Sequence, residues 1–129
     1  MAEAARAREQ AYAPYSGFPV GAALLTRGGR VVRGCNVENG SFGLSICAER
    51  NAVFKAVSEG ERDFVAVAVT AGPKNNASPC GACRQVLREF SPDLVVFWQD
   101  ARGRILKARI EELLRKPFVW AVRQRRKGT

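Results

Sequence analysis

Histidine is absent from all 129 residues of the sequence. This absence excludes hydrolases built on Ser-His or Cys-His pairs, because the general base of those pairs is missing. A zinc site in this chain would have to use cysteine or carboxylate ligands. An acid–base catalyst would have to be a carboxylate, lysine, tyrosine or cysteine. The absence of histidine therefore limits the residue types that could bind a metal and those that could transfer protons.

Long apolar runs are also missing, and none approaches the about 20 residues that a membrane-spanning helix needs. Residues 1–9 lack the apolar stretch of a secretory signal, so we expect a cytoplasmic protein with no membrane partner. Four cysteines in that compartment are poor candidates for a disulfide framework. A Cys-x-x-Cys pair there more often indicates metal or redox chemistry.

Acidic residues are missing from the C-terminal part of the chain. All 12 acids and 15 of the 21 Lys and Arg residues lie in the first 114 residues, which leaves that part with a net charge of only +3. We therefore expect residues 1–129 to form a single domain in which about 115–129 are a basic tail that keeps the protein soluble. Nucleic acid is not expected as a partner.

Hydrophobic periodicity and turn residues predict the order of the elements. The patterns indicate helices over residues 3–12, 47–59, 80–90 and 110–114, and strands over 18–26, 31–36, 64–69, 94–98 and 105–106. The first two strands should form a hairpin, and the later ones should run parallel because they alternate with helices. The predicted fold class is α/β, a three-layer α/β/α sandwich with one mixed five-stranded sheet.

Three of the four cysteines lie at the predicted starts of helices. Cys80 and Cys83 are three residues apart on one helical face, and Cys47 opens another helix with Glu49 in its first turn. A helix N-terminus stabilises thiolates, and three protein ligands leave the fourth position of zinc for water. A Cys-x-Glu followed by a Pro-Cys-x-x-Cys is the three-cysteine form of the zinc deaminase signature. The spacing therefore predicts one Zn²⁺ per chain, with the Glu49 carboxylate able to reach toward the metal from the first turn of its helix.

Two alternatives remain open for these residues. Cys35 could join the other cysteines in a structural four-cysteine site, although its 12-residue separation from Cys47 is unlike a zinc knuckle. Arg50 could lie beside the metal and offset the net charge of −1 that three thiolates leave on zinc. It could equally be a solvent-facing helix residue, as most arginines are.

The chain resembles the small cytidine deaminases of nucleoside salvage from about residue 10 to about residue 114. The resemblance depends on four segments in order, which are APYSGFPVGAA at 13–23, GCNVEN at 34–39, ICAER at 46–50 and SPCGACRQV at 78–86. It implies zinc-dependent hydrolytic deamination of cytidine or deoxycytidine in pyrimidine salvage. It also implies that Cys47, Cys80 and Cys83 are the zinc ligands and that Glu49 is the catalytic proton shuttle.

The resemblance further implies a set of substrate-binding residues. Phe18 would line the pyrimidine pocket, Asn36 and Glu38 would bind the sugar hydroxyls, and Ala48 would also bind the substrate. From the residues alone, Phe18 could instead be a core residue at the start of a strand. Asn36 and Glu38 could likewise be exposed loop residues, as these types usually are.

A homotetramer with shared sites is the last implication of the resemblance, with Phe42 and Phe118 reaching a neighbouring subunit. Two rival functions stay open. One is the same chemistry on blasticidin S or on a cytosine in a nucleic acid. The other is a zinc-stabilised RNA-binding module that uses the basic tail, which would leave Glu49 without a purpose.

Overall fold

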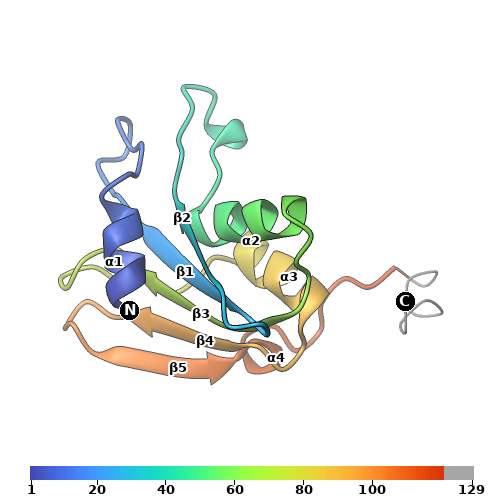
Figure 1. The fold of residues 1–129 in the computed structure, drawn as a ribbon. Coiled ribbons are helices and arrows are strands. Elements are labelled where there is room, and N and C mark those ends of the chain that lie inside the picture. The colour runs from blue at the N-terminus through green and yellow to red at the C-terminus, as the bar shows by residue number, and fades with distance from the viewer. Residues whose placement is uncertain (121–129) are drawn as a thin grey trace.

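The computed structural model describes residues 1–120, and Figure 1 shows one sheet with helices on both faces. No helix in this part of the chain is long and apolar enough to cross a membrane. Most of the predicted basic tail lies outside the described residues. The elements are the helices α1 (Ala2–Arg8), α2 (Ala48–Ser58), α3 (Gly81–Phe90) and α4 (Ile110–Leu113), and the strands β1 (Gly21–Thr26), β2 (Val31–Cys35), β3 (Phe64–Thr70), β4 (Val95–Gln99) and β5 (Ile105–Arg109).

The sheet is mixed and has the strand order β2-β1-β3-β4-β5. Strand β1 pairs antiparallel with β2 and β3, and β3 pairs parallel with β4. The prediction that the later strands run parallel is right for this pair and wrong for β5, which is antiparallel to β4. The reason is the short turn between them, in which the Asp100 carboxylate accepts hydrogen bonds from the N–H groups of Arg102 and Arg104. A parallel neighbour would need a crossover of a dozen residues or more.

Helix α1 is shorter than the predicted 3–12 and ends at Arg8. Beyond that residue the chain turns to pair with the segment that follows β2. The N–H of Tyr12 donates to the carbonyl of Asn36 at 3.0 Å, and the carbonyl of Tyr12 accepts from the N–H of Glu38 at 2.9 Å. A tertiary contact thus overrides the local helix propensity of the alanine-rich segment.

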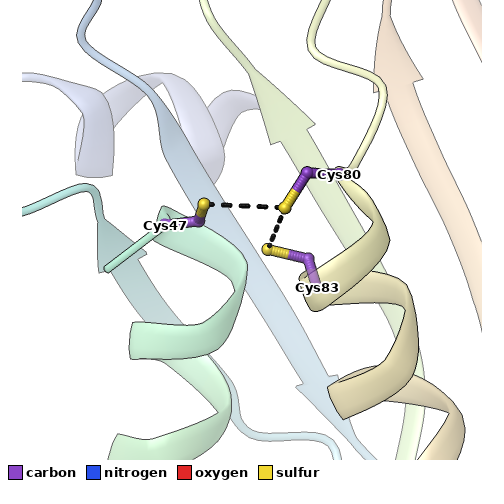
Figure 2. A group of neighbouring side chains, drawn as sticks. All are labelled: Cys47, Cys80 and Cys83. Atoms are coloured by element: carbon purple, nitrogen blue, oxygen red, sulfur yellow. Dashed lines mark hydrogen bonds between the residues drawn. The ribbon is translucent and has the colours of Figure 1, made fainter. Parts of the chain in front are cut away.

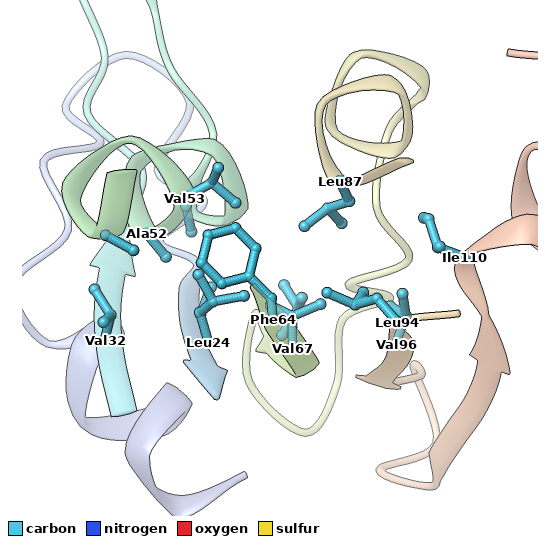
Figure 3. Close-up of a cluster of buried hydrophobic side chains, with 14 of the residues drawn as sticks. Leu24, Val32, Ala52, Val53, Phe64, Val67, Leu87, Leu94, Val96 and Ile110 are labelled. Atoms are coloured by element: carbon cyan, nitrogen blue, oxygen red, sulfur yellow. The ribbon is translucent and has the colours of Figure 1, made fainter. Parts of the chain in front are cut away.

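The hydrophobic core lies between the sheet and the helices α2 and α3. Two alanines of α2, Ala48 and Ala52, are fully buried, and they let the helix approach β2 closely. The contact is close enough that a β-carbon at Gly34 would lie 2.5 Å from the carbonyl oxygen of Ala48. Figure 3 shows the side chains that fill this layer, among them Leu24, Val32, Val53, Phe64, Val67, Leu87, Leu94, Val96 and Ile110.

Candidate metal centre and active site

The N-termini of α2 and α3 meet and bring three cysteines together (Figure 2). Cys47 is the N-cap of α2, Cys80 is the N-cap of α3, and Cys83 lies in the first turn of α3. The sulfur of Cys80 is 3.8 Å from that of Cys47 and 3.5 Å from that of Cys83. All three sulfurs lie within 4.8 Å of one another, so a single ion could contact each of them.

The ionisation of the thiols in this cluster favours the binding of a cation. The hydrogen bond from Cys83 and the neighbouring Arg50 lower the pKa of Cys47 to about 5 despite its partial burial. The same hydrogen bond and burial raise the pKa of Cys83 well above its usual value. Each thiolate in this half-buried site makes its neighbours harder to ionise, because adjacent negative charges repel each other. A zinc ion would remove this conflict, and three thiolates with an open fourth position form a zinc site suited to catalysis.

Cys35 points away from this cluster, so the alternative of a structural metal site made by all four cysteines is excluded. A β-carbon at Gly34 would point into α2, as the contact with Ala48 shows. Successive residues of a strand point to opposite faces of the sheet, so Cys35 faces the side covered by α1. It lines a hollow there with Ala7 and Gln10 of the α1 region. Burial raises the pKa of its thiol, as expected for a small apolar residue.

Arg50 lies beside the cluster rather than in solvent. Its guanidinium Nη2 donates to the sulfur of Cys47 at 3.3 Å. This hydrogen bond raises the pKa of the guanidinium further, so Arg50 stays charged. A fixed positive charge at this distance could offset the excess negative charge of three thiolates.

Glu49 is buried next to the cysteines, with only 5% of its surface exposed. Burial, supported by the negative charge of Cys47, raises the pKa of its carboxyl to about 7. A carboxyl with such a pKa can both accept and donate a proton near neutral pH. Glu49 therefore combines the position and the acidity that a proton shuttle requires.

A cavity of about 350 Å³ opens onto Cys47, Cys80 and Glu49. This volume is within the range of about 300–1,000 Å³ that is usual for small-molecule sites. The predicted substrate residues Phe18, Asn36, Glu38 and Ala48 all line it. Its other lining residues are Ser16, Val20, Val69, Asn76, Ala77 and Ser78.

The amide of Asn36 shapes one wall of this cavity. Its Oδ1 accepts from the N–H of Val20 at 2.8 Å, and its Nδ2 donates to the carbonyl of Phe18 at 2.9 Å. Asn36 is 9% exposed, so these bonds fix a nearly buried side chain. The amide therefore holds the backbone that carries Phe18, and its remaining lone pair and N–H are open to a ligand.

Glu38 fixes the loop next to Asn36. Its Oε1 accepts from the N–H groups of Tyr15 and Ser16, and its Oε2 accepts from the Ser16 hydroxyl. The Ser16 hydroxyl also accepts from the N–H of Phe18 at 3.0 Å. These hydrogen bonds, led by that of the Ser16 hydroxyl, lower the pKa of Glu38. Glu38 thus presents a carboxylate at the mouth of the cavity.

Phe42 and Phe118 lie outside this cavity, and both rings are exposed, at 75% and 76% respectively. Phe42 contacts Tyr15 edge-on, with ring centroids 6.0 Å apart, and lines a separate hollow beside Glu38. Phe118 is held on α3, because both its N–H and its carbonyl bond to the amide of Gln85 at 3.0 Å. Within one chain these two aromatic residues contribute nothing to the cavity.

Several of the lining residues were not expected from the sequence. Ser16 and Ser78 lie within the segments that carry the resemblance, which was the available signal for them. Asn76 and Ala77 belong to a polar loop whose pattern indicates no chemistry. Asn76 takes its place through a local turn in which its Oδ1 accepts from the N–H of Ser78 at 2.9 Å.

Comparisons with known proteins agree with this geometry. The family model of the cytidine and deoxycytidylate deaminase zinc-binding region matches residues 1–99. A cytidine deaminase of Halalkalibacterium halodurans is 55% identical over 117 residues, which are 90% of this chain and 89% of that protein. The blasticidin-S deaminase of Bacillus cereus is 32% identical over 103 residues, covering 74% and 73% of the two chains. The crystal structure of cytidine deaminase from Burkholderia pseudomallei superposes with a TM-score of 0.86 at 48% identity, over 91% of this chain and 94% of that one.

Proposed function

The chain belongs to the cytidine and deoxycytidylate deaminase family, and we propose from that premise that it hydrolyses cytidine or deoxycytidine to uridine or deoxyuridine and ammonia. The observation that carries the proposal is the buried Glu49 beside three convergent cysteines, two of which, Cys47 and Cys80, line the same cavity as Glu49. A zinc ion held by Cys47, Cys80 and Cys83 would supply the acidity that activates water at neutral pH.

Glu49 performs the proton transfers of the reaction. Its carboxylate takes a proton from the attacking water and delivers it to N3 of the pyrimidine as a new bond forms at C4. It then takes the second proton of this water from the hydroxyl now on C4 and passes it to the amino group, which leaves as ammonia when the C4–N bond breaks. The pKa of about 7 lets the same carboxyl act as base and then as acid.

The remaining residues of the cavity orient the nucleoside. Phe18 offers an apolar face for the pyrimidine, and Ala48 is the first residue of α2. Its backbone N–H is one of the free donors of a helix start and can bind a pyrimidine oxygen. Glu38 and Asn36 accept hydrogen bonds from the sugar hydroxyls at the mouth of the cavity. A carboxylate at that place repels a phosphate, which favours a free nucleoside over a nucleotide or a nucleic acid.

The test follows the ultraviolet absorbance of cytidine and deoxycytidine with the zinc-loaded protein and with Glu49→Gln. We expect the parent to convert both spectra to those of the uridine products. Glu49→Gln keeps the shape of the side chain, so we expect it to retain one zinc per chain and to lose about 10²–10⁴-fold in kcat. Conversion of blasticidin S or of cytosine in an oligonucleotide, without conversion of either nucleoside, would contradict the proposal. Wild-type turnover by Glu49→Gln would contradict the role of this carboxyl.

We further propose that the protein is a homotetramer in which neighbours complete each site. Two features support this proposal. The rings of Phe42 and Phe118 are both exposed, and large exposed aromatic residues are typical of interfaces. Phe42 contacts Tyr15, and the backbone of Phe118 is hydrogen-bonded to Gln85. Light scattering on the eluted protein should give about four times the 14.1 kDa chain mass. Phe118→Ala should raise KM or reduce this mass, and a fully active monomer would contradict the proposal.

The cytoplasm is the compartment that fits this chemistry. The three cysteines must stay reduced to bind a metal, and the cytoplasm keeps thiols reduced. Salvage of free pyrimidine nucleosides there would supply the substrate. Fluorescence microscopy of the tagged full-length chain should therefore show diffuse cytoplasmic signal, and secretion into the medium would contradict this location.

A further inference from the structure

The residue that follows Cys83 connects three segments near the metal centre. Arg84 lies in the first half of α3, and its guanidinium donates through each of its three nitrogens. Nε donates to the carbonyl of Pro79 at 2.8 Å, and Nη2 donates to the hydroxyl of Ser78 at 3.0 Å. Nη1 donates to the carbonyl of Leu113 at 3.0 Å. Two of the three contacts therefore hold the turn that delivers Cys80.

This turn has a local hydrogen bond at Asn76, whose Oδ1 accepts from the N–H of Ser78 at 2.9 Å, and Arg84 adds contacts from outside it. Cys80 is the exposed N-cap of α3, and its side chain makes no capping hydrogen bond to the helix. The chain before it is tied to the sheet at Ala77, whose N–H donates to the carbonyl of Gln99 at 3.0 Å. Between Ala77 and the helix, the guanidinium of Arg84 holds a backbone carbonyl and a side-chain hydroxyl of the turn. The direction of the Cys80 side chain thus depends on this guanidinium.

The third contact connects the turn to the hydrophobic core. Leu113 ends α4, whose first residue, Ile110, is fully buried and donates its N–H to the carbonyl of Leu94 at 2.8 Å. The guanidinium therefore bridges a half-exposed turn and a firmly anchored short helix. A rigid planar group that donates in three fixed directions can make this bridge, whereas the flexible single ammonium of lysine cannot.

We propose that Arg84 is a positioning residue for the metal centre, acting on zinc through the Ser78–Cys80 turn and not through its charge. This inference rests on the assignment of the three cysteines to zinc. The inference gives the two arginines of the site different roles. Arg84 acts through the turn, whereas Arg50 contacts the sulfur of Cys47 directly. Outer partners that orient a metal ligand typically contribute about 10–100-fold to metal affinity. We therefore expect the loss of this bridge to weaken zinc binding by that factor.

The experiment measures zinc affinity by competition with a chromogenic chelator for the parent and for Arg84→Lys, Arg84→Met and Ser78→Ala. Arg88→Lys is the matched control, because Arg88 lies one turn further along the same helix. Both Arg84 variants should bind zinc about 10–100-fold more weakly, and Ser78→Ala should show a smaller loss. The control should bind like the parent. Arg84→Lys keeps the positive charge but loses the planar guanidinium that donates in three directions. Weak zinc binding by this variant would therefore identify geometry, and not charge, as the cause.

Cobalt(II) substitution gives a second readout that does not depend on turnover. The visible bands of the cobalt-loaded Arg84 variants should shift relative to the parent, because Cys80 no longer meets the ion at the same angle. Parent-like zinc affinity and cobalt spectrum in Arg84→Lys would overturn the proposal, and so would an equal loss in Arg88→Lys. If Arg84→Met does not fold, Arg84→Lys and Ser78→Ala carry the test. The measurement uses no substrate, so it is distinct from a failure of the deaminase assignment.

Discussion

Replacing Gly34 by alanine tests how the sheet positions the catalytic helix. The added β-carbon would lie 2.5 Å from both the carbonyl oxygen of Ala48 and the amide nitrogen of Ala52, and 2.9 Å from the α-carbon of Ala52. Backbone atoms cannot rotate out of the way as a flexible side chain can. Since unstrained carbon contacts lie near 3.5 Å, α2 would have to move from β2 by about 1 Å.

These distances indicate how much Gly34→Ala should lower the unfolding free energy and the turnover. Overpacking of this kind costs about 1–3 kcal/mol in unfolding free energy, which outweighs the about 0.5–1 kcal/mol that alanine gains over glycine in a strand. We expect the melting temperature to fall by several degrees, since about 1 kcal/mol corresponds to roughly 2–8 °C in domains of this size. Because α2 also carries Cys47 and Glu49, a displacement of about 1 Å should lower kcat by about 10²-fold.

The assay pairs thermal unfolding with the cytidine absorbance measurement. Gly28→Ala is the matched control in the neighbouring hairpin turn, where an added β-carbon would meet only the hydroxyl of Thr26 at 3.9 Å. The control should keep the melting temperature and the kcat of the parent. If Gly34→Ala also keeps both, the close approach of β2 and α2 is not what places the active-site residues.

Two further predictions concern Cys35 and Glu38. Cys35→Ser should leave the zinc content at one per chain, because this thiol faces α1; a loss of zinc in elemental analysis would contradict that placement. Ser16→Ala removes the main hydrogen bond that lowers the pKa of Glu38, so that carboxylate should become protonated at a higher pH than in the parent. Because sugar binding needs the ionised form, which is lost as the pH falls through that pKa, the acid-side rise in KM should begin at a higher pH. An unchanged KM profile would show that Glu38 does not bind the sugar.

Much of the local structure was predictable because it depends on neighbouring residues. Apolar runs located each strand, although β5 extends to Arg109 and only its residues 105–106 were predicted. The cysteines at the starts of α2 and α3 were visible as motifs. The boundary of α1 was not predictable from propensity, because it depends on the pairing of Tyr12 with the segment after β2. The direction of β5 was misjudged, although the short turn at Asp100 held the information that it must be antiparallel.

The cavity was predictable in part. Phe18, Asn36, Glu38 and Ala48 came from the resemblance and all line it, whereas Asn76 carried no signal. The sequence also showed no sign that Asn36 and Glu38 hold the loop around Ser16 and Phe18, since each of these hydrogen bonds joins residues 16 to 23 positions apart.

The sequence by itself determined the chemical groups available to this protein. With no histidine, a zinc site was limited to cysteine or carboxylate ligands and a proton-transfer group to carboxylate, lysine, tyrosine or cysteine, and the spacing of Cys80 and Cys83 placed two thiols on one helical turn. The motifs predicted that Cys47 would join them, but only the tertiary structure brings the three sulfurs within 4.8 Å of one another and turns Cys35 to the opposite side of the sheet. Only packing buries Glu49 and raises its pKa, because desolvation depends on atoms from distant segments. Acidity and metal geometry are therefore properties of the assembled fold, built from groups that the sequence supplies.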